Sequence, residues 1–203
     1  MKNRKVTVCL PLAYMITKVL WKENKILKKH VEKRFLYLFT GESVALIGFI
    51  FVSYLGNNKY PQFELYSLPS FWISFFLLEF LLVQGSYYWF TKWKRFRREK
   101  TFTTPTRTVR VLKKLQKLNI LIIVITSIVF ILDFVKWNPN LPVGFYIALA
   151  VYVFSILEYI NYFHIQLSYD NPSDIKHLMQ TKKLKQASLN KDFERVFGAK
   201  GKR

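Results

Sequence analysis

The sequence predicts an all-α integral membrane protein: a four-helix bundle of two helical hairpins, with basic amphipathic cytoplasmic helices attached. Two observations support this prediction. Of the 203 residues, 51% are hydrophobic, while Lys and Arg outnumber Asp and Glu by 32 to 12, a formal net charge of +20. The apolar and basic residues do not interleave, as they would on a soluble domain, but occupy separate blocks.

Four apolar blocks are long enough to cross a bilayer, whose hydrocarbon core needs about 20 helical residues. Each block is apolar around its whole circumference, which is typical of a helix in lipid. None alternates as the strands of a membrane β-barrel do. Pro69 and Pro142 precede two of the blocks, where the start of a helix accepts proline. The predicted spans are residues 35–56, 70–91, 119–137 and 143–165.

The basic residues predict which way the spans face. Of the 32 Lys and Arg residues, 30 fall in the segments 1–34, 92–118 and 166–203, and the other side of the spans has only Lys59 and, at the end of the third span, Lys136. Cytoplasmic loops carry the excess of Lys and Arg, so these three segments are predicted to be cytoplasmic, with both chain ends inside. We therefore expect a multi-pass protein of a cell membrane, and the composition favours a bacterial cytoplasmic membrane.

The chain accordingly divides into a basic amphipathic N-terminal segment (1–34), the four-span bundle with its basic connection (35–165), and a basic cytoplasmic tail (166–203). Apolar residues recur at helical spacing over 10–31 with lysines between them, which predicts a helix lying at the inner membrane interface or a solvated lead-in helix. The tail is expected to form an amphipathic helix after Pro172, broken near residues 187–190.

Seven basic residues beside the second and third spans are the candidate contacts for anionic phospholipid head groups. Clusters of Lys and Arg directly next to a span attract such lipids, with about 1 kcal/mol per cation near the surface. The candidates are Lys92, Lys94, Arg95, Arg97, Arg98, Lys113 and Lys114. The expected partners are the lipid bilayer and its anionic head groups, with a membrane-protein partner or a homo-oligomer as alternatives. No nucleic-acid-binding motif is present, so nucleic acid is not expected.

Each predicted span also carries one acidic residue, and an ionisable group within a span indicates a functional site by default. Asp133 lies three residues before Lys136, and we expect these two side chains to pair. The remaining polar groups are predicted to form a cluster in the inner half of the bundle. Its members are Glu42, Glu79, Gln84, Glu158, Asn161 and His164.

Three interpretations of this cluster are open. Hydrogen bonds between helices would contribute about 0.6 kcal/mol each to stability. The same groups could instead line a proton or cation pathway, or a pocket for a head group or substrate. A metal site is not expected, because Glu158 and His164 alone supply too few ligands. Cys9 is the single cysteine and excludes an internal disulfide.

The sequence contains no GxSxG, HExxH, Walker or GxGxxG motif, so no catalytic residue and no cofactor is predicted. We expect a non-enzymatic accessory or regulatory membrane protein whose basic cytoplasmic face binds anionic lipid or a partner. The first alternative is a small proton- or cation-coupled transporter or channel that uses Glu79 and Glu158. The second alternative is a lipid-modifying membrane enzyme.

Overall fold

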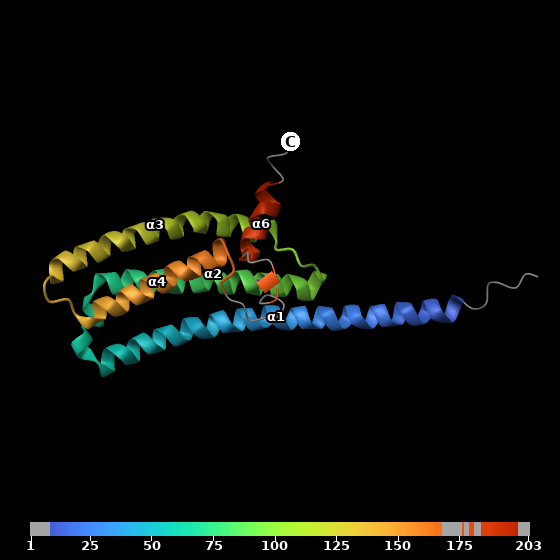
Figure 1. Cartoon of the computed structure of the whole chain (residues 1–203), viewed down its shortest axis with the longest axis horizontal. Helices are drawn as coiled ribbons and strands as arrows, with labels where there is room; N and C mark the ends of the chain where they lie inside the picture. Colours follow the sequence, from blue (N-terminus) through green and yellow to red (C-terminus); the bar gives the residue numbers. More distant parts are fainter. Residues whose placement is uncertain (1–8, 168–175, 177–178, 181–183, 199–203) are drawn as a thin grey trace, which may run out of the picture.

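The computed structural model describes residues 9–167, 176, 179–180 and 184–198, with side chains from residue 27 onward. These parts of the chain form a bundle of four long helices with a short helix at one end (Figure 1). The helices are α1 (Cys9–Lys59), α2 (Pro69–Glu99), α3 (Thr106–Trp137), α4 (Val143–Phe163) and α6 (Ser188–Phe197). Two 3-10 turns, η1 (Pro61–Phe63) and η2 (Leu65–Ser67), join α1 to α2.

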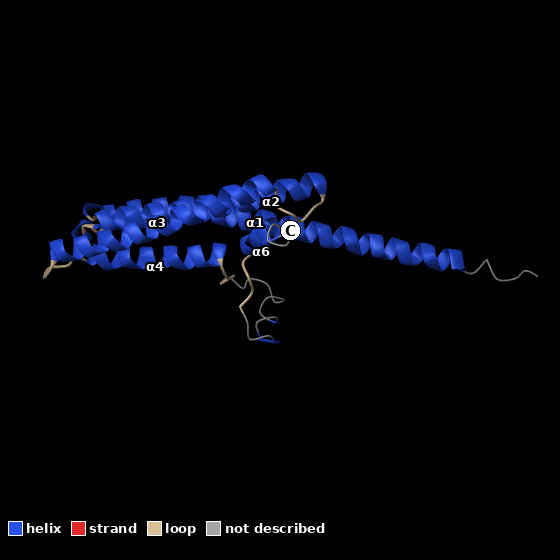
Figure 2. Ribbon diagram, turned by 90° about the horizontal axis from the view of Figure 1, so that it is seen from above, coloured by secondary structure: helices blue, strands red, loops and turns tan. Residues whose placement is uncertain are grey.

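The four long helices confirm the predicted membrane bundle. Each is long and apolar enough to cross a membrane. Helix α2 is the central one, since it packs against α1, α3 and α4 (Figures 1 and 2). Half of the apolar stretch of α2 is buried inside the protein, against only 6% of the corresponding stretch of α1. The outer surface of α1 is therefore available to lipid.

At one end of the bundle, α2 and α3 continue beyond the predicted spans. Helix α2 runs on to Glu99, and α3 begins at Thr106 rather than at residue 119. Lys100 ends α2 in the left-handed conformation (φ 54°), and its N–H donates to the carbonyl of Phe96 over 2.9 Å. We call the end formed by residues 27–34, 92–118 and 184–198 the basic end.

The N-terminal segment differs from the prediction of a separate helix lying at the membrane interface. The structure has one continuous helix from Cys9 to Lys59, which runs past the end of α2 in the direction of the first span (Figure 1). Between Pro11 and Gly41 the sequence has neither proline nor glycine, so no residue there terminates the helix.

The C-terminal part of the chain returns to the basic end. Most residues of the helix expected after Pro172 lie outside the described residues, whereas α6 begins at Ser188, inside the expected break. Two backbone hydrogen bonds join the segment before α6 to the end of α4. The N–H of Gln166 donates to the carbonyl of Lys185 over 2.7 Å, and the N–H of Ala187 donates to the carbonyl of His164 over 3.1 Å. Helix α6 then packs against α3 and α4.

Asp133 does not form the expected pair with Lys136. Its Oδ2 accepts the backbone N–H of Ser70 over 2.8 Å, and the residue is only 3% exposed. No ion pair joins Asp133 to Lys136 among the described residues, and the Lys136 ammonium lies 5.7 Å from the ring centre of Trp137. The first N–H groups of a helix lack partners within it, and α2 has no side-chain cap of its own. Asp133 of α3 therefore caps the start of α2.

Replacing Asp133 with Ala is expected to lower the free energy of unfolding in detergent by about 1–2 kcal/mol, the usual cost of losing a helix cap. Lys136→Ala is the control, and should change the free energy of unfolding by less than about 0.5 kcal/mol. An equal loss in both variants would show that the Asp133–Lys136 pair, and not the cap, carries the stability.

Candidate functional site

A groove at the basic end lies between the last turns of α2 and the start of α3. Its volume is about 480 Å³. Three of the seven predicted lipid contacts line it: Lys94, Arg95 and Arg98. Arg107 was not among the predicted lipid contacts; it lies at the start of α3 and joins the other cations when α3 folds back beside α2. The other lining residues are Thr91, Glu99, Pro105 and Thr106.

The groove carries more positive than negative charge. The guanidinium Nε of Arg95 donates to Oε2 of Glu99 over 2.7 Å, so this pair is neutral overall. Arg98 and Arg107 have no carboxylate partner among the described residues, and the Lys94 ammonium lies 5.8 Å from the ring centre of Phe90. Within the described part of the chain, these three cations are therefore available to an anion from outside.

The start of α3 adds to this positive potential. Pro105 precedes the helix and provides no side-chain cap, and the first turn contains no acidic residue. The first hydrogen bond of the turn runs from the N–H of Val109 to the carbonyl of Pro105 over 3.2 Å. The preceding N–H groups have no partner within the helix, and a helix N-terminus favours anions.

Lys92 faces away from the groove and into the protein. Its side chain is 12% exposed, and its ammonium lies 3.7 Å from Oδ2 of Asp192 in α6. The ring centres of Phe35, Tyr88 and Trp89 lie 5.7, 5.0 and 5.6 Å from the same ammonium. Lys92 therefore stabilises the packing of α6 against α2, whereas the sequence predicted that it contacts a lipid head group.

Asp192 is the centre of this contact, and the sequence prediction missed it. Its Oδ2 accepts hydrogen bonds from the hydroxyl of Tyr88 over 2.9 Å and from that of Thr104 over 2.6 Å. Arg195 places Nη2 3.1 Å from Oδ1 and also donates to the carbonyl of Thr104 over 2.8 Å. One carboxylate thus joins α6 to α2 and to the connection between α2 and α3.

A sequence signal for Asp192 did exist. The residue is flanked at helical spacing by Leu189, Phe193 and Val196, so it is an acid on the apolar face of an amphipathic helix. Charged residues are almost never fully buried unless they are paired. An acid in that position therefore indicates a basic partner elsewhere in the chain.

The remaining predicted lipid contacts serve different purposes. The Lys113 ammonium lies 4.7 Å from the ring centre of Phe193 and donates to the side chain of Gln116 over 2.9 Å, so it supports α6. The Arg97 guanidinium lies 5.4 Å from the ring centre of Trp93. Lys114 is exposed and lies outside the groove.

Within the bundle, the structure brings part of the predicted polar cluster together. Gln84 of α2 and Asn119 of α3 exchange two amide hydrogen bonds, each 3.0 Å long, and both residues are buried. The Asn161 amide donates to Glu158 over 3.4 Å within α4. The backbone N–H of Leu167 donates to Asn161 over 2.9 Å.

Glu42 is held by a residue that the sequence prediction did not include. The hydroxyl of Tyr162 donates to its carboxylate, and the carboxyl groups of Glu42 and Glu158 are close enough to interact electrostatically. Gly85 makes this contact possible, because a Cβ at that position would lie 2.7 Å from the Tyr162 ring and hydroxyl. The Tyr162 side chain of α4 thus passes α2 at Gly85 and reaches Glu42 of α1.

Glu79 and His164 do not join the other members of the cluster. Both carboxylate oxygens of Glu79 are buried and have no hydrogen-bond partner in the described part of the chain. His164 follows the last residue of α4, and its Nε2 lies 3.4 Å from the hydroxyl of Tyr159. No group of three or more His, Cys, Asp or Glu side chains that could hold a metal ion occurs among the residues described.

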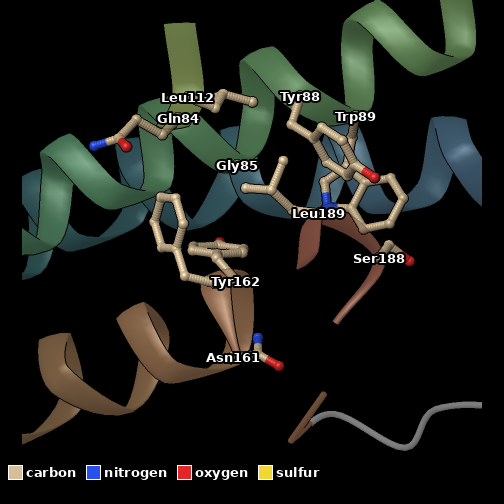
Figure 3. Close-up of a pocket in the computed structure, with 10 residues that line it drawn as sticks. Gln84, Gly85, Tyr88, Trp89, Leu112, Asn161, Tyr162, Ser188 and Leu189 are labelled. Carbon is tan, nitrogen blue, oxygen red and sulfur yellow. The ribbon is translucent and has the colours of Figure 1, made fainter. Parts of the chain in front are cut away.

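A small cavity lies between these pairs and α6. Its volume is about 30 Å³, and a water molecule needs about 10–15 Å³ of such space, so it holds at most a few waters. Gln84, Gly85, Asn161 and Tyr162 line it, and Leu189 of α6 points into it from the basic end (Figure 3). Neither Glu79 nor Glu158 lines this cavity.

No family model matches the chain, and neither a curated protein nor a solved structure is similar to it. The fold defines the class, a four-helix membrane bundle. The groove and the interior are therefore the features that bear on its function.

The Asp192→Asn variant is expected to loosen α6. Removing one partner of a buried ion pair costs about 3 kcal/mol, which corresponds to about a hundredfold faster hydrogen exchange of the α6 amides. Glu194→Gln is the matched control: it removes the same charge from the same helix, but Glu194 is exposed, and the contact of its carboxylate among the described residues is with the Gln186 amide, over 2.6 Å. Equal exchange rates in the two variants would contradict a role for the buried carboxylate.

Proposed function

We propose that the chain is a non-enzymatic accessory or regulatory membrane protein whose basic end faces the cytoplasm and binds anionic phospholipid head groups. The groove at the basic end is the observation that carries the proposal. Lys94, Arg98 and Arg107 offer three cations without acidic partners among the described residues. Thr91, which ends the predicted second span, also lines the groove, so these cations lie at the depth of the head groups.

The charge distribution supports the orientation. The segments that contain 30 of the 32 Lys and Arg residues all precede or follow spans on the same side of a four-span chain. By the positive-inside rule this side is cytoplasmic. The chain is then a multi-pass protein of a cell membrane, with both ends in the cytoplasm.

The interior supports a structural role for the intramembrane polar groups rather than a transport pathway. Gln84 pairs with Asn119, and Glu42 pairs with Tyr162, so these groups are used in contacts between helices. The cavity beside them admits only a few waters and touches neither Glu79 nor Glu158, the acids that a transporter would use. An accessory or regulatory role agrees better with this interior.

The proposal is tested by replacing the three groove cations together: Lys94→Gln, Arg98→Gln and Arg107→Gln. Each cation near the surface contributes about 1 kcal/mol, so the affinity for phosphatidylglycerol should fall at least about tenfold. Native mass spectrometry of the detergent-solubilised protein, titrated with that lipid, measures the affinity.

The matched control removes the same charge outside the groove: Arg110→Gln, Lys114→Gln and Lys117→Gln, all at exposed positions of α3. It should retain the wild-type affinity within about threefold. If both triple variants lose affinity equally, the overall charge and not the groove attracts the lipid. If neither loses affinity, the proposed function is wrong.

The orientation is tested by cysteine labelling in intact cells, since Cys9 is the single cysteine and Cys9→Ser gives a cysteine-free background. A membrane-impermeant maleimide should label Lys59→Cys, between the first two spans, without permeabilisation. It should label Lys114→Cys, at the basic end, only after permeabilisation. The reverse pattern would place the basic end outside.

A further inference from the structure

We infer that the groove selects head groups carrying two or more negative charges, phosphomonoesters or diphosphates, over singly charged phosphodiesters. The inference rests on the proposed function, because it names the class of head group that the same groove takes. Three features of the groove carry it: its residual charge, the geometry of its donors and its position beside the membrane.

The net positive charge of the groove is larger than the single negative charge of a phosphodiester can neutralise. Four cations and one acid line the groove, a net charge of +3, and the acid, Glu99, is already bound to Arg95. A phosphodiester contributes one negative charge, whereas a phosphomonoester carries about −1.5 to −2 at pH 7. The more highly charged head group therefore neutralises more of the groove.

The donors also match a phosphomonoester. Arg98 lies in the last turn of α2 and Arg107 in the first turn of α3, so two guanidinium groups come from different helices, and each has several N–H donors in a planar fork. A terminal phosphate presents three unesterified oxygens, one more than a phosphodiester. Lys94 lines the same groove and can bind that third oxygen, and the start of α3, whose first N–H groups have no partner within the helix, lies beside it.

The position beside the membrane favours a lipid over a free phosphate. Tyr87 lies one helical turn before Thr91 on the same face of α2, and 47% of its surface is exposed. An aromatic side chain at the membrane interface contacts the region between head groups and acyl chains. A head group in the groove would thus keep its acyl chains against α2.

The experiment compares short-chain phosphatidic acid, phosphatidylglycerol and phosphatidylcholine on the full chain in neutral detergent, by native mass spectrometry. Phosphatidic acid should bind at least about fivefold more tightly than phosphatidylglycerol, the effect of one further charge near the surface. The double variant Arg98→Gln, Arg107→Gln should reduce that ratio to about one. The variant Arg110→Gln, Lys114→Gln should leave the ratio unchanged.

The outcomes separate this inference from the proposed function. Equal affinity for phosphatidic acid and phosphatidylglycerol, with both above phosphatidylcholine, would overturn the inference and leave the proposed function standing. Equal affinity for all three lipids would overturn both. Inorganic phosphate or diphosphate that competes as strongly as phosphatidic acid would show a soluble anion to be the ligand and overturn the choice of a lipid.

Discussion

The cost of leaving a polar group unpaired away from water determines how these helices pack. Lipid offers no hydrogen bonds, so each polar side chain inside the bundle needs a partner from the protein. Such contacts join Ser70 to Asp133, Gln84 to Asn119, and Tyr162 to Glu42. Two of these three contacts involve α2, which agrees with its central place. Glu79 is an exception, and a protonated carboxyl there costs far less than a charged one.

At the basic end, Lys and Arg residues that lie close together in the sequence serve two different purposes. Lys92 and Lys113 face inward, where an acid and aromatic rings hold them against α6. Lys94 and Arg98 lie on the other side of α2, where no acid of the described chain pairs with them. Two residues along a helix correspond to about 200° of rotation, so Lys92 and Lys94 necessarily point in different directions. The helix geometry thus separates a structural contact from a candidate binding surface.

The sequence allowed the bundle itself to be predicted, because span length and the separation of charge are properties of each segment alone. The end of α3 at Trp137 and the start of α4 at Val143 agree with the predicted spans. The Asp133–Lys136 pair was wrong because spacing along one helix cannot reveal the start of another helix brought beside it. The groove and the Asp192 contact likewise depend on α2, α3 and α6 meeting in space.

The position of Asp192 in the chain has a consequence for biogenesis. Ribosomes deliver the four spans to the membrane before α6 emerges, since α6 follows them in the sequence. Until then Lys92 lacks its carboxylate partner, and Leu189 has not yet closed the small cavity. Assembly of this protein therefore has a late step, in which a segment that follows the four spans packs against them and completes the core at the basic end.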